Sequence, residues 1–259
     1  MEIENKYASK GVAGAGLGLG IAGTALGLLQ GNGLQNILGG WGRRDRLDNL
    51  FDVIDRIRDT GVFRNGLILE IGSWVVNETL AVFKRWKDKY NYPMVMSINI
   101  SAMQYQQENF VSDLLNMLER YDIKPDEIEL EITESLFIDN ISLVKEKLHL
   151  LRDYGIRISL DDFGTGFSSL SYLQGLPIDT LKIDKSFVDN VEELGAGRTI
   201  TESIVRLVDN LGYETIAEGV ETPKQYEYLK SIGCDIVQGF LLGKPMPEHE
   251  IDKLLIKLL

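Results

Sequence analysis

The sequence predicts an α/β fold in which a parallel sheet forms a TIM-like (β/α) barrel. Two observations carry the prediction of a parallel sheet. From about residue 66 onward, short runs rich in β-branched residues alternate with longer runs of helical periodicity. The centres of the strand-like runs lie roughly 30 residues apart, which is the size of a strand–helix–strand unit with parallel strands. Six such units form either a doubly wound sheet or most of a barrel.

The individual elements follow from local patterns. A strand is expected where an apolar, β-branched run is bounded by polar or turn-forming residues. The expected strands span residues 95–101, 128–133, 157–161, 180–183, 214–217 and 236–240. A helix is expected where apolar residues recur at intervals of three and four. The expected helices lie near residues 74–90, 104–121, 140–153, 197–211, 223–232 and 248–258.

Polar residues at the ends of the expected strands favour the barrel over the doubly wound sheet. In chain order they are Asn99, Glu131, Asp161 with Asp162, Lys182, Glu218 with Glu221, and Gln238. In a barrel, the carboxyl ends of all strands converge on one face, where active sites form. In a flat sheet, residues from six strands would lie too far apart to meet.

Four acidic residues would share this face, namely Glu131, Asp161, Asp162 and Glu218. Their charges repel one another unless cations neutralise them. Two divalent cations would do so, and an all-oxygen ligand set favours Mg²⁺ or Mn²⁺. Two such metals activate a water and stabilise an in-line displacement at phosphorus, while Lys182 orients the water or neutralises charge. Isolated surface acids, the alternative, do not account for four acids on successive strands beside a lysine.

Composition narrows the functional class further. The single cysteine, Cys234, excludes a disulfide framework and a cysteine-based zinc site, and two histidines leave little room for histidine catalysis. Acidic residues outnumber basic ones by 39 to 27, which gives a net charge of −12. We therefore expect no binding of duplex nucleic acid, because that function requires a basic face.

The first 65 residues differ in character from the rest. Residues 1–42 form a Gly/Ala-rich apolar segment, and residues 43–65 read as an amphipathic helix or linker. The stretch 11–29 is just long enough to cross a bilayer as a helix, and the arginines after it would hold the remainder on the cytoplasmic side. Its glycines weaken a helix in water, so membrane contact and irregular packing on the domain both stay open.

Several motifs in residues 66–259 resemble those of one family. They are GLILEIGSWV at 66–75, NISA at 99–102, EITE at 131–134, DDFGTGFSSL at 161–170, LKID at 181–184, AEGVE at 217–221 and QGF at 238–240. By these motifs the chain resembles the EAL-domain family of cyclic di-GMP phosphodiesterases. The resemblance implies a barrel of the EAL type that opens cyclic di-GMP to linear pGpG.

The resemblance also implies roles for single residues. The implied ligands of two Mg²⁺ or Mn²⁺ ions are Asn99, Glu131, Asp161, Asp162 and Glu218. Lys182 would position the water, Glu221 would brace the loop after Asp162, and Gln238 and Asp184 would contact the substrate. A homodimer through the loop after Asp162 and a cytoplasmic location are implied as well.

One departure from the family pattern matters. The Glu-Ala-Leu motif and the opening strands of the family should lie before Gly66, and the sequence contains no Glu-Ala-Leu run. The barrel is therefore expected to be incomplete, open at its first strands, or completed by residues 1–65 or another chain. Three functions stay open: a phosphodiesterase, impaired or not; a non-catalytic cyclic di-GMP-binding module; and an inactive fusion fragment.

Overall fold

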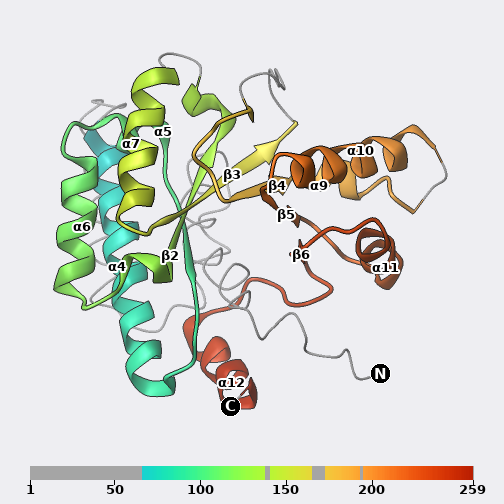
Figure 1. The fold of residues 1–259 in the computed structure, drawn as a ribbon. Helices are drawn as coiled ribbons and strands as arrows, with labels where there is room; N and C mark the ends of the chain where they lie inside the picture. The colour runs from blue at the N-terminus through green and yellow to red at the C-terminus, as the bar shows by residue number, and fades with distance from the viewer. Residues whose placement is uncertain (1–65, 138–140, 165–172, 193–194, 259) are drawn as a thin grey trace, which may run out of the picture.

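The computed structural model of the protein describes residues 66–137, 141–164, 173–192 and 195–258 (Figure 1). The segment 1–42, the stretch 43–65 and most of the loop after Asp162 lie outside these residues, so the expectations for them stay predictions. Within the described ranges, none of the helices combines the length and the apolarity that a membrane crossing requires.

Six parallel strands form one curved sheet, as the sequence predicts (Figure 1). They are β1 (Met96–Asn99), β2 (Ile128–Thr133), β3 (Arg157–Phe163), β4 (Thr180–Ile183), β5 (Glu214–Ala217) and β6 (Ile236–Val237). The strands lie side by side in chain order. This order is that of a (β/α) barrel, because a doubly wound sheet reverses its order at a switch point. In the described part of the chain the sheet ends at β1 and β6, so the barrel is open there, as predicted.

Helices precede, connect and follow the strands, and they pack around the sheet. They are α4 (Gly66–Tyr90), α5 (Ala102–Gln106), α6 (Phe110–Arg120), α7 (Ile141–Asp153), α9 (Lys185–Val188), α10 (Ala196–Asn210), α11 (Pro223–Ser231) and α12 (Glu248–Leu258). Short 3₁₀ turns, η4 (Pro125–Glu127) and η5 (Glu134–Phe137), flank β2. In Figure 1, α4, α6 and α7 lie on one side of the sheet beside β1 to β3, and α10 and α11 lie near β4 to β6.

Two helix boundaries differ from the expected ones. The single helix expected near 104–121 is two helices, α5 and α6. Ser101 caps α5 in a capping box with Gln104, and Gln107 leaves the helical conformation with a ψ of 137°. The helix before β1, α4, starts at Gly66 rather than near residue 74.

Three strands differ from their expected bounds as well. The first, expected over 95–101, is β1 over Met96–Asn99 and so ends two residues early. β3 continues two residues beyond the expected end at Asp161. The last strand, expected over 236–240, pairs over two residues only. Just beyond it the chain presses Gly239 against the loop after β5, so closely that a Cβ at this position would lie 2.2 Å from Val220 O. This approach leaves no regular ladder for the remaining residues.

Alternation along the strands separates the core from the candidate site. Ile98 pairs with Leu130 in register, and Leu130 pairs with Ile158. All three side chains are fully buried in the core under the helices. Because successive side chains of a strand point to opposite faces, the next residues along, Asn99 and Glu131, face the inner side of the sheet.

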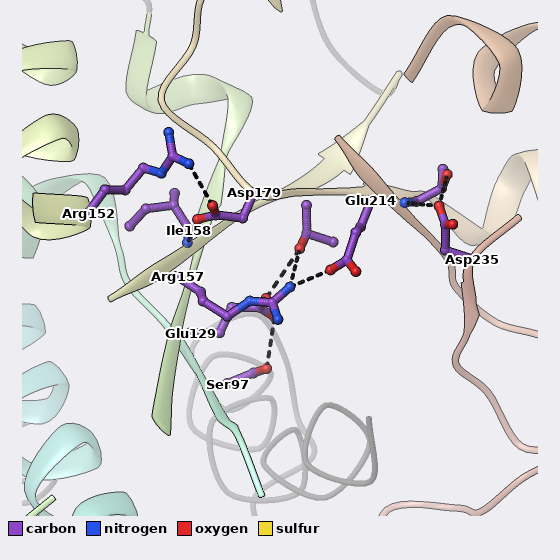
Figure 2. A network of polar contacts seen from close by, with 10 residues as sticks. Ser97, Glu129, Arg152, Arg157, Ile158, Asp179, Glu214 and Asp235 are labelled. Carbon is purple, nitrogen blue, oxygen red and sulfur yellow. Dashed lines mark hydrogen bonds and ion pairs between the residues drawn. The ribbon is translucent and has the colours of Figure 1, made fainter. Parts of the chain in front are cut away.

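A charged network ties the amino-terminal ends of the strands together (Figure 2). Arg157, the first residue of β3, forms ion pairs with Glu129 of β2 and Glu214 of β5. Ser97 of β1 donates a hydrogen bond of 3.1 Å to Glu129. Burial raises the pKa of the Glu129 carboxyl, while Arg157 acts against that shift. Thr180 of β4 also donates to Glu129 at 3.3 Å, so the network links five strands at the end of the sheet opposite the candidate site.

A cavity of about 450 Å³ opens beside this network. Its charged lining residues already pair within the protein: Arg152 with Asp179 at 2.8 Å, and Arg157 with Glu214. Balanced charges of this kind leave no net attraction for a charged ligand, and active sites of barrels form at the other end of the strands. This cavity is therefore not the candidate site.

Candidate active site

The carboxyl ends of the strands bring the predicted site residues to one face. Asn99 ends β1 and lies in register with Glu131 of β2. Asp161 lies near the end of β3, Lys182 belongs to β4, and Glu218 directly follows β5. Five neighbouring strands thus each contribute one polar side chain, as the barrel interpretation requires.

Lys182 lies at the centre of this group and its side chain is fully buried. Its Nζ lies 3.1 Å from Glu131 Oε2, 3.0 Å from Asp161 Oδ1 and 2.7 Å from Glu218 Oε1. Burial by itself lowers the pKa of a lysine, but the three carboxylates outweigh it and raise the pKa of Lys182. The ammonium group therefore stays charged and holds three like charges together.

Glu131 is the most deeply buried acid of the group. Burial raises the pKa of its carboxyl to about 7, with Asp161 and Glu218 adding to the shift and Lys182 opposing it. Its Oε2 accepts a 3.0 Å hydrogen bond from Asn99 Nδ2 as well as facing Lys182. Its Oε1 is buried and has no hydrogen-bond partner among the described residues. A buried carboxylate oxygen without a partner is costly unless a ligand satisfies it.

Asp161 and Asp162 reach the same site through a break in the strand pairing. Consecutive residues of a regular strand point to opposite faces. Here the register of β3 against β4 shifts between Leu160 and Phe163, and Asp162 adopts a left-handed φ of 56°. Aspartate tolerates this conformation better than most residues do. The backbone N–H of Asp162 donates to Asp161 Oδ1 at 3.0 Å, so the irregularity lets both carboxylates serve one site.

The carboxylates fit a divalent cation. Asp161, Asp162 and Glu218 each offer an oxygen, and these three atoms lie within 4.8 Å of one another. Burial raises the pKa of Glu218 and of Asp162, and Asp161 adds to both shifts, as expected for acids crowded without enough positive charge. Together with the unpartnered oxygen of Glu131, this all-oxygen set matches the preference of Mg²⁺ or Mn²⁺.

Gln238 and Asp184, the predicted substrate contacts, lie at the carboxyl ends of β6 and β4, the strands on either side of β5. Gln238 follows β6, and its backbone N–H donates to Ala217 O at 2.8 Å. Its side-chain Oε1 is buried with no hydrogen-bond partner in the described part of the chain. Asp184 follows β4 and caps α9, since its Oδ1 accepts from the backbone N–H of Ser186 at 3.0 Å. It directly follows the strand that carries Lys182, and its charge contributes to the raised pKa of Asp162.

Glu134 has a contact that the sequence analysis did not assign. It begins η5, and its Oε1 accepts a 2.8 Å hydrogen bond from the backbone N–H of Gly164, where the loop after Asp162 starts. Glu221 lies 3.2 Å from Lys185 Nζ, and its expected role in bracing that loop stays a prediction because most of the loop lies outside the described residues. The available signal was the place of Glu134 in the EITE motif, three residues after Glu131 and next to a turn.

The match to family models agrees with this geometry. The EAL domain model matches residues 60–245, which cover every residue of the site described above. The chain belongs to the EAL domain family. Relatives in this family include the signaling protein YkoW of Bacillus subtilis, 41% identical over 192 residues. Another is the bifunctional diguanylate cyclase/cyclic di-GMP phosphodiesterase MucR of Pseudomonas aeruginosa, 38% identical over 188 residues.

These matches cover 74% and 73% of the EAL chain, but only 24% and 27% of YkoW and MucR. The chain therefore spans about a quarter of the length of these curated relatives. Among solved structures, the PaMucR phosphodiesterase in complex with c-di-GMP aligns with a TM-score of 0.68 at 37% identity, over 76% of this chain and 78% of that chain. Klebsiella pneumoniae BlrP1 in a manganese/cy-diGMP complex aligns with a TM-score of 0.62 at 27% identity, over 71% and 47%.

Proposed function

We propose that this EAL domain is a cyclic di-GMP phosphodiesterase that hydrolyses its substrate to linear pGpG. One observation carries the proposal: Lys182 joins Glu131, Asp161 and Glu218 at the carboxyl ends of the strands. Relatives whose names include this activity, and a relative whose structure holds c-di-GMP, support the same assignment. The geometry alone supports metal-assisted hydrolysis, and the relatives narrow the substrate.

The proposed metal ligands are those expected from the sequence: Asn99, Glu131, Asp161, Asp162 and Glu218. Two Mg²⁺ or Mn²⁺ ions bound there would supply an activated water and positive charge for the phosphate oxygens. The manganese complex of BlrP1 supports this choice of metal. Asn99 keeps one oxygen of Glu131 fixed by its hydrogen bond, which leaves the other oxygen aimed at a cation.

The remaining residues act on the substrate side of the proposed reaction. Lys182 orients the attacking water or neutralises charge that develops on the phosphate, because its ammonium group is buried beside the cluster. Gln238 offers the substrate a buried amide oxygen, and Asp184 offers a carboxylate at the end of β4. Glu134 holds the first turn of the loop after Asp162 through Gly164.

One feature favours a second function, a binding module that holds cyclic di-GMP without cutting it. The chain has no Glu-Ala-Leu run, and in the described ranges no strand precedes β1. The glutamate of that motif would be one more metal ligand by family resemblance. Loss of a ligand commonly reduces metal affinity or rate by orders of magnitude, which would leave nucleotide binding without turnover.

Hydrolysis by the full-length chain tests the proposal. The assay follows conversion of cyclic di-GMP to pGpG with Mn²⁺, using Asp162→Ala as the inactive variant and Asp209→Ala, an exposed acid of α10, as the matched control. Turnover in the parent and Asp209→Ala but not in Asp162→Ala is the expected result. No turnover in the parent, combined with nucleotide binding in Ca²⁺, would assign the binding module instead. If the parent neither hydrolyses nor binds the nucleotide, the chain is an inactive fragment.

The proposal includes two features of the whole molecule. We expect the domain to lie on the cytoplasmic side, because cyclic di-GMP is a cytoplasmic messenger. The family resemblance favours a homodimer through the loop after Asp162. Sedimentation velocity with and without nucleotide tests the dimer. Flotation with lipid vesicles tests whether residues 11–29 bind a membrane.

A further inference from the structure

The loop that carries Glu218 is packed between two other segments. This loop, residues 218–222, connects β5 to α11 and is called the β5–α11 loop below. On one side, the backbone N–H of Val220 donates to Gln238 O at 3.0 Å. On the other side lies the segment 185–192, which contains α9. Thr222 Oγ1 contacts Glu192 Oε1 across this second boundary.

Lys185, the first residue of α9, covers the most deformable point of the β5–α11 loop. Gly219 adopts a left-handed φ of 69°, and a Cβ built there would lie 2.3 Å from Lys185 Cγ and 2.7 Å from its Cβ and Cδ. The aliphatic stem of Lys185 therefore lies directly on the Gly219 backbone. Glycine has more accessible conformations than any other residue, so a contact that confines it restricts the residues on either side.

The charged end of Lys185 joins the same two segments. Its Nζ lies 2.5 Å from Asp189 Oδ1 in its own segment and 3.2 Å from Glu221 Oε1 in the β5–α11 loop. The lysine side chain is 44% exposed, and exposed ion pairs contribute little stability. The pair instead fixes where the stem lies, so that the stem stays over Gly219.

Glu218 directly precedes the residue that Lys185 covers. Its backbone N–H donates to Ile183 O at 3.0 Å, and its Oε1 lies 2.7 Å from Lys182 Nζ. The first contact fixes the peptide before Glu218, and the Lys185 stem confines the peptide after it. The direction of the Glu218 carboxylate therefore depends on both.

We infer that Lys185 is a positioning residue that keeps the Glu218 carboxylate directed at the metal site by confining Gly219 and Glu221. This inference rests on the proposed function, because it assigns Glu218 to a divalent cation. Lys185 acts through the loop and touches neither the cluster around Lys182 nor, by this inference, the metal. A residue that orients a metal ligand in this way typically affects metal affinity by 10- to 100-fold.

Three variants of the full-length chain distinguish the effect of the aliphatic stem of Lys185 from the effect of its charge. Lys185→Ala removes both, Lys185→Met keeps a stem of similar length without charge, and Lys253→Met removes an exposed ion pair of α12 as a control. Mn²⁺ alone is the probe, and its dissociation constant is measured by electron paramagnetic resonance of free Mn²⁺ without nucleotide. Thermal unfolding without metal is measured in parallel, because a purely structural role would change only the unfolding midpoint.

We expect Lys185→Ala to raise the dissociation constant for Mn²⁺ by about tenfold. Lys185→Met should raise it by a smaller factor, because the stem is kept. Lys253→Met should leave it unchanged. Equal Mn²⁺ affinity in the parent and Lys185→Ala would overturn the inference, whatever the unfolding midpoints. A parent that binds Mn²⁺ without hydrolysing cyclic di-GMP would defeat the proposed function alone, and the affinity ratio would still decide the role of Lys185. A parent that binds no Mn²⁺ would overturn both.

Discussion

Lys182 Nζ lies 2.7 Å from Glu218 Oε1, and this contact joins the end of β4 to the loop after β5 inside the barrel. The same ammonium group also contacts acids from β2 and β3. A single buried cation thus compensates carboxylates from three neighbouring elements. Three negative charges with one positive charge remain unbalanced, and that imbalance is what favours the binding of further cations.

Replacing Lys182 by methionine should destabilise the chain when no metal is present. The variant leaves buried carboxylates without their counter-charge, which typically costs about 3 kcal/mol or more in the free energy of unfolding. Protonation of Glu131, whose pKa is already raised to about 7, moderates that loss near neutral pH. Urea denaturation at pH 8, with and without Mn²⁺, measures the effect. Mn²⁺ should restore part of the lost stability, because it supplies positive charge at the same carboxylates.

Lys253→Met is the matched control for this experiment, since its exposed pair with Glu250 should contribute well under 1 kcal/mol. A Lys182→Met variant as stable as the parent at pH 8 without metal would show that the buried ion pairs do not hold the cluster together.

Much of this site could be predicted from the sequence, because strand ends in a barrel converge. That rule places Asn99, Glu131, Lys182 and Glu218 on one face without any knowledge of contacts. It does not explain how Asp161 and Asp162 both reach the site. Their approach depends on a register shift and a left-handed residue, and neither leaves a periodic signal in the sequence.

Contacts between distant loops were also beyond sequence reasoning. Glu134 bonds to Gly164 across 30 residues, and Lys185 covers Gly219 from a different strand end. Hydrophobic periodicity reports which face of an element is buried, but it says nothing about which loops meet. The break between α5 and α6 is a milder case. The capping pair of Ser101 and Gln104 is visible in the sequence, but the apolar pattern continues across the break between the two helices.

The free energy of unfolding should depend on pH through Glu131 in a defined direction. The pKa of this group is about 7 in the folded chain and ordinarily 4.5, so the folded state holds the proton more tightly. Its contribution is fully present below about pH 4.5 and is lost as the pH rises through about 7. Comparing the parent with Glu131→Gln by urea denaturation at pH 5 and pH 8 without metal isolates this group. The parent should lose on the order of 2 kcal/mol more than the variant over that range.

Glu227→Gln, an exposed change on α11, controls for the general effect of removing one carboxylate. Mn²⁺ should reverse the trend in the parent, because it binds the deprotonated acid and therefore stabilises the chain more at pH 8 than at pH 5. An identical pH dependence in the parent and Glu131→Gln would contradict the raised pKa.

Removing the Glu134 carboxylate should loosen the start of the loop after Asp162. Its Oε1 is the acceptor for the Gly164 amide, and hydrogen bonds to charged groups contribute about 1.5–3 kcal/mol. Amide hydrogen exchange at Gly164 should therefore be faster in Glu134→Ala. Glu134→Gln retains an acceptor oxygen and should exchange nearly as slowly as the parent. Equal exchange rates in the parent and Glu134→Ala would mean that this bond does not hold the loop.

Cys234 provides a labelling test of metal binding that needs no substrate. It is the single cysteine of the chain and is buried, and burial raises the pKa of its thiol to about 12. At pH 8 the thiol is therefore protonated as well as inaccessible, so a thiol reagent reacts only after the structure opens. If that opening is global, Mn²⁺ at a hundredfold excess over its dissociation constant should slow labelling by about a hundredfold.

Rapid labelling in native buffer would contradict the burial of Cys234. Slow labelling that Mn²⁺ leaves unchanged would mean that opening at Cys234 is local, or that the carboxylates around Lys182 bind no metal. Labelling in urea, where opening becomes global, separates these two cases.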